Sequence, residues 1–530
     1  MNMKGKIFAF LLAGLPLLSS AQADSRGKGW NVVLFLVDDL GWMDLSSSGS
    51  ALYETPNIDR LRSEGVYFSD AYSTCHVCSP SRASLMTGKY PARVGVTDWL
   101  TGRKDQPFQR LAQSKTLQVL PSEEVTLAET LKRNAYRTAI IGKWHLGDAS
   151  PATEHGFDLQ LPRWNKGWPN TYYAPFRLDG LEGPEGEYLT DRLTDEALRF
   201  IGSDTSKPFF LFMSHYAVHD PIEGKPAFVE KYRRKLASMP QAEVLAPFAL
   251  EENPDTAYSF SDAEKGRLIG TEAYRGYSLL PNRMVKIKQR QDNAEFAAMV
   301  ESMDESLGRL VDGLKRMGIY DKTIIVFTSD NGGMSGANFG NPARKVQEKN
   351  LDKAFSTSNL PLRGAKGWMY EGGIRVPMIV RAPAAAAVRP RTVSTPVSGI
   401  DVYPTILDLL GLPQMPEQHR DGVSLRPLIV EGKPLKREAL YWYFPHYSNH
   451  GLQPPGAAIR KGDLKLIEYF EKGTVQLFDL SRDIGERKDL SAVRKKTVAR
   501  MRRDLDAWKK SLRLEPLKPN PGYSLGTAGR

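Results

Sequence analysis

The sequence predicts an α/β fold, in which helices cover both faces of a doubly wound sheet and a smaller antiparallel sheet follows. Four continuously apolar runs predict the central strands, and each ends at polar residues: 32–37, 138–141, 209–213 and 323–327. Runs in which apolar and polar side chains do not alternate are typical of strands buried on both faces. Helical segments lie between them, and this alternation favours a doubly wound sheet, whose ligands bind beyond the carboxyl ends of the strands.

Two of these helical segments carry clear signals. Thr126 and Glu129 form a capping box ahead of the apolar residue Leu127. In the second segment apolar residues recur at helical spacing, at Phe296, Met299, Val300, Met303, Leu307, Leu310, Val311 and Leu314. We expect that face to belong to the core.

Residues 78–88 read Cys-Ser-Pro-Ser-Arg-Ala-Ser-Leu-Met-Thr-Gly and predict a turn into a short helix. Ser79 suits the N-cap and Gly88 the C-terminal end. Cys78 would then face the helix N-terminus, where backbone N–H groups favour an anion, with Arg82 one turn further along the same face. The segment therefore predicts an oxyanion site. The alternative is a buried structural cysteine on an ordinary capped helix.

The last part of the chain has a different character. From about residue 436, four short strands separated by turn residues are predicted, at 440–444, 457–460, 464–469 and 475–480. A final amphipathic helix follows, with Val498, Met501, Leu505, Trp508 and Leu512 at core spacing. We expect residues 24–435 to form the main domain and 436–530 a small subdomain of antiparallel sheet and helix. Residues 221–293 are polar and irregular, and predict either an insertion that shapes the substrate site or a surface excursion.

Residues 1–23 are typical of a secretory signal peptide. Lys4 and Lys6 precede the apolar run 7–18, and Ala-Gln-Ala at 21–23 offers a cleavage site. The run is short for a membrane span, and no later stretch is long and apolar enough. We expect an exported protein, periplasmic or secreted, with no stable membrane span.

The net charge of +11 is compatible with an anionic substrate. Much of the excess lies in runs such as 494–503, which predict a solvated surface instead. Nucleic acid is not an expected partner, because the sequence contains neither a recognisable nucleic-acid-binding module nor a basic stripe with aromatic residues.

The chain has only two cysteines, Cys75 and Cys78. In an exported protein this spacing permits a local disulfide or a redox pair. Zinc is disfavoured, because no second pair of ligands lies at a suitable spacing. A disulfide would consume the thiol that the oxyanion site needs.

Two pairs of residues with side-chain oxygen atoms directly follow two of the predicted strands. Asp38 and Asp39 are adjacent, and Gly41 suggests a turn that lets both carboxylates face one point. Without a cation the two acids would repel each other and one pKa would rise. Asp330 and Asn331 add two more ligands of the kind that Ca²⁺ or Mg²⁺ prefers. For either pair alone, turn and cap chemistry is the simpler explanation, but together with Cys78 they predict a metal site.

The Cys-x-Pro-Ser-Arg string at residues 78–82 resembles the active-site signature of the formylglycine-dependent sulfatases. The chain is similar to this arylsulfatase-like family, and within it to bacterial exo-acting carbohydrate sulfatases, over most of its length. Further matching segments occur in the same order as in the family, at residues 36–41, 55–60, 142–147, 329–333 and 362–377. The resemblance implies an alkaline-phosphatase-like fold, with a large central mixed sheet sandwiched by helices. It assigns residues 24–435 to the catalytic domain.

The resemblance also implies two prosthetic features. A formylglycine-generating maturation enzyme would oxidise Cys78 to an aldehyde before the chain folds, and the aldehyde would be hydrated to a diol. One Ca²⁺ would be held by Asp38, Asp39, Asp330 and Asn331, with residue 78 at the same ion.

The family mechanism assigns roles to the remaining residues of these motifs. One diol oxygen would attack sulfur in line, with Arg82 steadying the diol and Lys143 and Lys366 binding sulfate oxygens. His219 would protonate the departing sugar oxygen. His145 would then take the proton of the second hydroxyl, which expels sulfate and restores the aldehyde.

The general acid that protonates the departing sugar oxygen could instead be His215, four residues before His219. The His-x-Pro context of His219 fits the family, although Asp220 departs from the family's pattern. The choice between the two histidines stays open at this point.

A carbohydrate substrate is suggested by Asp98, Trp99 and Arg103, which closely follow the signature. The Thr-Asp-Trp run resembles exo-acting carbohydrate sulfatases, some of which act on 4-sulfated galactose or N-acetylgalactosamine. His419 and His446 could reach the pocket from later segments. A further loop combines aromatic and polar side chains that suit sugar rings and ordinary packing alike: Trp164, Asn165, Trp168 and Asn170.

Two other functions fit many of these residues. A phosphate mono- or diester hydrolase on the same fold would use the lysines and His145 for a different tetrahedral anion. A catalytically silent protein that binds sulfated glycans is the third possibility.

Overall fold

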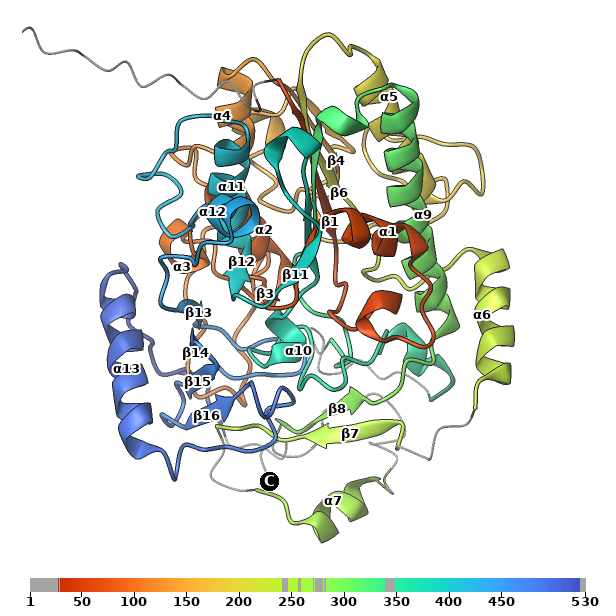
Figure 1. Cartoon of the computed structure of the whole chain (residues 1–530). Coiled ribbons are helices and arrows are strands. Elements are labelled where there is room, and N and C mark those ends of the chain that lie inside the picture. Colours follow the sequence, from red (N-terminus) through yellow and green to blue (C-terminus); the bar gives the residue numbers. More distant parts are fainter. Residues whose placement is uncertain are drawn as a thin grey trace, which may run out of the picture.

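An eight-stranded mixed sheet forms the centre of the molecule, with strand order β11-β2-β10-β9-β1-β6-β4-β5 (Figure 1). The computed structural model describes residues 27, 29–240, 246–255, 259–269, 271, 280, 283–338 and 348–524. The four predicted runs form four adjacent parallel strands, β1 (Asn31–Val37), β4 (Arg137–Gly142), β6 (Phe209–Ser214) and β9 (Thr323–Ser329). The predicted central sheet is therefore confirmed.

Shorter strands complete this sheet and make it mixed. β10 (Met378–Arg381) runs antiparallel to β9 on one side and to β2 (Val66–Phe68) on the other. β11 (Arg391–Val393) and β5 (Leu159–Leu161) are the edge strands. The mixed sheet that the family resemblance implies is confirmed.

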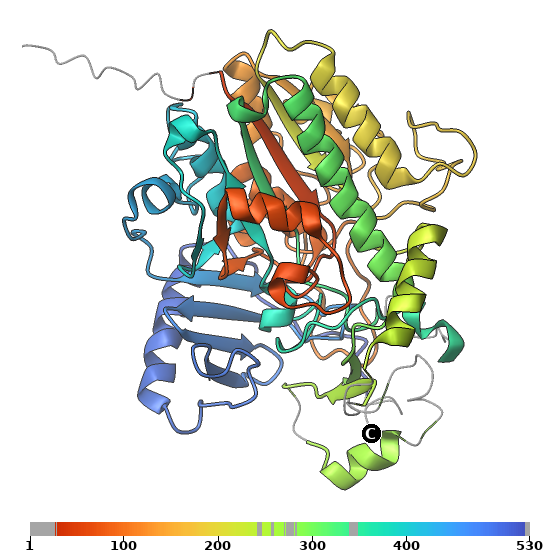
Figure 2. The same ribbon diagram turned by 45° about the vertical axis from the view of Figure 1, so that its right-hand side comes forward.

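Helices cover both faces of the sheet, as Figures 1 and 2 show. Alternate residues of β1 contribute to two separate cores. Val33 and Phe35 pack with α1 (Pro56–Glu64), α5 (Leu189–Gly202), α6 (Pro226–Ser238) and α9 (Ala294–Arg316). Val32 and Leu34 pack with α2 (Cys78–Thr87), α4 (Leu127–Arg133), α11 (Val402–Leu409) and α12 (Arg426–Glu431). Burial on both faces explains why these runs lack polar alternation.

The predicted helix signals are confirmed with one exception. The capping box of α4 forms, because Thr126 accepts from the Glu129 N–H and Glu129 accepts from the Thr126 N–H. α2 ends at Gly88, whose φ is 68°. The prediction that Ser79 caps α2 is wrong, because the helix already begins at Cys78 and its N-cap is Val77. The Ser79 hydroxyl instead accepts from the Leu100 N–H at 3.2 Å.

The predicted C-terminal sheet is confirmed and lies beside the central one (Figure 2). It runs in the order β13 (Leu440–Phe444), β14 (Gly456–Lys461), β15 (Leu464–Tyr469) and β16 (Val475–Asp479), all antiparallel. α13 (Lys495–Lys510) covers one face through Met501 and Leu505. The other face packs on Trp368 and Tyr370, in the loop that carries Lys366.

Part of the segment 221–293 is regular. Besides α6 it contains α7 (Asp262–Ile269) and the antiparallel strand pair β7 (Phe248–Glu251) and β8 (Val285–Lys288). The small elements α3 (Pro91–Val94), α10 (Glu371–Ile374), β3 (Ala71–Tyr72) and β12 (Val397–Ser398) lie in loops elsewhere. The expected signal peptide, residues 1–23, lies outside the described residues, and the domain boundary at 435/436 stays a prediction. Among the described residues, the helices all lack the length and apolar character that crossing a membrane requires.

A buried ion network joins the C-terminal sheet to the central domain and yields a first prediction. Lys465 on β15 lies 2.9 Å from both Glu371 and Glu486, and all three side chains are fully buried. Lys465→Met leaves two carboxylates without their shared cation, so we expect the free energy of unfolding to fall by about 3 kcal/mol in urea titrations. The control Lys509→Met removes a partly exposed partner of Glu468 and should cost about 1 kcal/mol or less. Equal losses in the two variants would contradict the role of the buried network.

Candidate active site

The carboxyl ends of the central strands bring the predicted site residues together. β1 leads into Asp38 and Asp39, and β9 into Asp330 and Asn331. Lys143 and His145 follow β4, and His219 follows β6. Backbone hydrogen bonds extend the sheet pairing into these ends: the Asp38 N–H donates to Ala217 at 2.9 Å, and the Lys143 N–H to Ser214 at 2.7 Å. The prediction that these polar groups gather at one sheet edge is confirmed.

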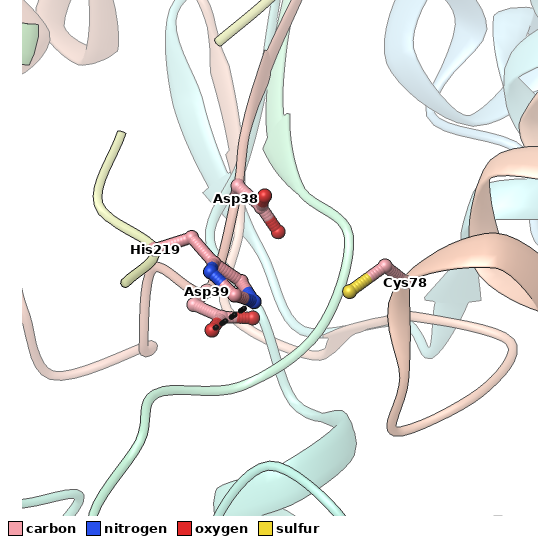
Figure 3. A group of neighbouring side chains, drawn as sticks. All are labelled: Asp38, Asp39, Cys78 and His219. Carbon is pink, nitrogen blue, oxygen red and sulfur yellow. Dashed lines mark ion pairs between the residues drawn. The ribbon is translucent and has the colours of Figure 1, made fainter. Parts of the chain in front are cut away.

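The two adjacent aspartates point into one space, as predicted from the turn. Asp39 has a φ of 62°, a left-handed conformation that aspartate tolerates better than most residues. One ligand atom from each of Asp38, Asp39, Cys78 and His219 can be chosen so that all lie within 4.8 Å of one another. Figure 3 shows the Cys78 thiol facing the two carboxylates and the His219 ring. His145 is also left-handed, with φ 56°, and such backbone strain is common at functional sites.

Three buried cations balance three buried carboxylates in this space. Lys143 lies 2.6 Å from Asp38, and Lys366 lies 2.8 Å from Asp39. The guanidinium of Arg82 donates to Asp330 at 2.9 Å through Nε and lies 2.8 Å away through Nη2. A divalent cation added to this set would leave an excess of positive charge, which an anionic substrate can neutralise.

The oxygen atoms of this cluster fit a hard cation. Asp38 Oδ1 and Asn331 Oδ1 are buried and have no hydrogen-bond partner among the described residues. The Asn331 side-chain amide donates to Asp39 Oδ1 at 2.7 Å, which places its own free oxygen beside the carboxylates. Among the described residues, Asp330 Oδ1 accepts only from the Asp39 N–H, at 3.2 Å. Carboxylate and amide oxygens are the ligands that Ca²⁺ and Mg²⁺ prefer.

The two cysteines are separate free thiols in different electrostatic surroundings. Burial raises the pKa of Cys78, but the charges of Lys143 and Lys366 outweigh burial and hold it well below its ordinary value. At Cys75 burial dominates and raises the pKa to about 12. Only Cys78 therefore lies in an electropositive setting, and the local disulfide is not formed.

The structure separates the two candidate acids. His219 Nε2 lies 3.7 Å from Asp39 Oδ2. Burial and Lys366 lower the pKa of His219, but Asp39 and Asp38 outweigh them and raise it to about 9. His215 packs on the Phe35 ring at 5.0 Å and shares a hydrogen bond with Ser306, and burial lowers its pKa to about 3. His219 therefore lies at the site and His215 in the core.

His145 is placed to accept a proton. Its Nε2 donates to the Leu100 carbonyl at 2.8 Å, whereas Nδ1 has no hydrogen-bond partner among the described residues. Burial lowers the pKa of His145, so the ring is neutral. His145 also acts on the pKa of Cys78, so its ring lies close to this thiol.

The loop with Trp164 and Trp168 lies directly over His145, and this yields a second prediction. A Cβ on Gly167 would lie 2.5 Å from His145 Cε1. Gly167→Ala should displace the ring and lower kcat about 10- to 100-fold in steady-state assays, because small misplacements of a catalytic group are costly. Gly266→Ala, at a helical glycine with open space around it, is the matched control and should keep full activity. Equal activity of the two variants would show that the loop does not hold His145.

The predicted substrate residues form a group of their own. Arg103 donates to Asp98 through Nε and Nη2 at 2.8 Å, and both side chains are buried. The rings of Trp99 and Trp168 lie 6.3 Å apart. His446 shares a hydrogen bond with Thr97 beside this group. The expectation that His419 reaches the pocket is wrong, because its Nε2 accepts from the Met415 N–H and its ring packs on Tyr403.

The sequence interpretation gave no site role to two residues near these groups. The Ser214 hydroxyl accepts from Arg82 at 2.7 Å and donates to the Lys143 carbonyl, which fixes the guanidinium. Ser214 directly follows the apolar run 209–213. Because polar residues at the ends of these strands face the site, its position in the sequence was a usable signal. His450 lies in the loop between β13 and β14 and packs against Gly367, the residue after Lys366. Nothing in the sequence around His450 predicted this position.

Comparison with known proteins decides the family. The model of the family described as Sulfatase matches residues 30–412, which is most of the chain. The chain belongs to the sulfatase family. It is therefore a sulfuric ester hydrolase, and the alkaline-phosphatase-like fold implied by its motifs is confirmed. A second model, described as N-sulphoglucosamine sulphohydrolase, C-terminal, matches residues 365–512 of this sulfatase.

Several relatives of this sulfatase are similar over most of their length. The N-acetylglucosamine-6-O-sulfatase of Bacteroides thetaiotaomicron is 27% identical, covering 89% of this chain and 84% of the relative. The N-acetylgalactosamine-6-sulfatase of Mus musculus is 29% identical, covering 78% of this chain and 68% of the relative. The crystal structure of Ps i-CgsB in complex with k-i-k-neocarrahexaose is 28% identical, with a TM-score of 0.66, and covers 91% of this chain and 93% of that one.

Proposed function

We propose that this sulfatase removes sulfate from a sulfated carbohydrate, using a formylglycine formed from Cys78 and Ca²⁺ bound by Asp38, Asp39, Asp330 and Asn331. The charge balance of the site carries the proposal. Three cations already match three carboxylates, so a bound divalent cation creates the excess positive charge that a sulfate ester needs. Relatives named for N-acetylglucosamine and N-acetylgalactosamine sulfates, and the buried Asp98–Arg103 pair, support a sugar substrate.

The residues around the sulfate have separate tasks. Lys143 and Lys366 hold sulfate oxygens as point charges, and Arg82, fixed by Asp330 and Ser214, holds the hydrated residue 78 in place. Ca²⁺ bound at the carboxylates would polarise the sulfate and stabilise the negative charge that develops on it. Maturation of Cys78 requires the formylglycine-generating enzyme.

The two histidines move the protons. The S–O bond to the sugar breaks as a hydroxyl of residue 78 attacks sulfur and loses its proton to a carboxylate of the cluster, and His219 Nε2 gives its own proton to the departing sugar oxygen. His145 Nδ1 then accepts the proton of the second hydroxyl, sulfate leaves, and the aldehyde returns. The neutral state of His145 suits its task of accepting a proton.

The substrate we propose to test first is 4-sulfated galactose or N-acetylgalactosamine at a chain end. The test measures sulfate release from 4- and 6-sulfated galactose, N-acetylgalactosamine and N-acetylglucosamine, by protein supplied with Ca²⁺ whose residue 78 is confirmed as an aldehyde by peptide mass. Release from one sugar and one position supports the proposal and names the substrate. A phosphate mono- or diester hydrolysed faster than every sulfate ester would overturn it, as would calorimetric binding of sulfated sugars without release.

A further inference from the structure

His450 is a buried imidazole without hydrogen-bond partners. It lies in the loop between β13 and β14 of the C-terminal sheet and is 8% exposed. Neither Nδ1 nor Nε2 has a partner among the described residues. Buried polar side-chain atoms are nearly always paired, so two unpaired nitrogens on one ring indicate a ligand that pairs them.

His450 packs against the loop that carries Lys366. A Cβ on Gly367 would lie 2.1 Å from the His450 carbonyl oxygen and 2.6 Å from its Cβ, so the residue after Lys366 packs directly on it. Burial, with the nearby charges of Lys366, Arg103 and His219, lowers the pKa of His450 well below its ordinary value. The ring is therefore neutral and lies close to the proposed acid and to a sulfate-binding lysine.

Arg103, whose charge acts on His450, offers a second unpaired group. Asp98 accepts from Nε and Nη2 of Arg103 and leaves Nη1 buried and without a partner among the described residues. Because Asp98 fixes the plane of the guanidinium, Nη1 is a donor with a set direction. An acceptor oxygen is the ligand that it needs.

We propose that His450 and Arg103 Nη1 together bind hydroxyl groups of the sugar that carries the sulfate, and that His450 is a specificity-determining residue. The inference rests on the proposed function and extends it. A neutral imidazole offers one donor and one acceptor nitrogen that point in different directions, so two sugar hydroxyl groups can satisfy it, one as acceptor and one as donor. A sulfate or carboxylate oxygen only accepts and would leave one nitrogen unpaired.

The test compares His450→Ala with the wild-type enzyme on two substrates, the sulfated sugar found in the panel and 4-nitrophenyl sulfate, which has no sugar. His450→Ala removes a hydrogen bond that only the sugar substrate makes. For the sugar, kcat/KM should therefore fall about 10- to 100-fold, mainly through a rise in KM. Turnover of the aryl sulfate should stay within about threefold of wild type. His450→Gln keeps a donor and an acceptor and should recover part of the loss. His419→Gln, at a buried histidine away from the site, is the matched control.

The outcomes separate this inference from the function on which it rests. Equal losses on both substrates, or an unchanged kcat/KM for the sugar, would overturn the role of His450 while leaving sulfate hydrolysis intact. A wild-type enzyme that hydrolyses neither substrate would overturn the proposed function itself. Thermal unfolding of each variant identifies a loss of activity that comes from misfolding. If His450→Ala misfolds, the activity of His450→Gln on the two substrates decides whether His450 binds the sugar.

Discussion

Cys78→Ala is expected to abolish sulfate release, by a factor on the order of 10⁴ or more, because the attacking group is removed. The fold should survive, since the change deletes one sulfur atom at the start of α2 and leaves the helix, Arg82 and Lys143 in place. The measurement is sulfate release by ion chromatography, with circular dichroism to check the fold.

Cys75→Ala is the matched control for this substitution. Both cysteines are buried and only three residues apart, but Cys75 packs with Val77 and Phe444 and lies outside the electropositive site. The control should therefore keep near wild-type activity. Residual turnover by Cys78→Ala comparable with that of Cys75→Ala would exclude position 78 as the nucleophile.

Removal of divalent cations is expected to abolish turnover and to lower the thermal midpoint of unfolding, and Ca²⁺ should restore both. A ligand that binds only the folded state stabilises it by about 3 kcal/mol at a hundredfold excess over its dissociation constant. Asp38→Asn removes a charge from the ligand set, and Lys143 loses its buried partner. In this variant Ca²⁺ should no longer raise the midpoint.

Asp304→Asn serves as the control for the loss of a buried carboxylate. Asp304 accepts from the N–H groups of Asn57 and Ile58 at the start of α1, away from the carboxylate cluster. This variant should be less stable than wild type but should keep the full Ca²⁺-dependent rise in midpoint. If Ca²⁺ stabilises Asp38→Asn as much as it stabilises wild type, the ion binds elsewhere.

The parts of the fold and site that could be predicted are those whose signals are local in sequence. The apolar run 32–37 ends at Asp38, and strand pairing on both sides of β1 carries that edge into the site. The spacing of Phe296 and its neighbours predicted α9 because helix periodicity needs no partner. The motif around Cys78 located the proposed nucleophile in the same way.

The parts that could not be predicted depend on contacts between distant segments. β10 is only four residues long, and its antiparallel direction follows from its pairing with β2 and β9. His215 and His219 differ because the His215 N–H still pairs with Leu36 of β1, which keeps its ring in the core. His450 reaches the site only because the C-terminal sheet packs on Trp368, more than eighty residues earlier in the chain.

The most direct measurement relates activity to the state of residue 78. Preparations made with and without a formylglycine-generating enzyme would be analysed by peptide mass for the fraction of aldehyde, and each would be assayed for sulfate release in the presence of Ca²⁺. We expect the rate to rise in proportion to the aldehyde fraction and to vanish in the all-thiol protein. A rate that is independent of this fraction would contradict the central claim that oxidised Cys78 is the nucleophile.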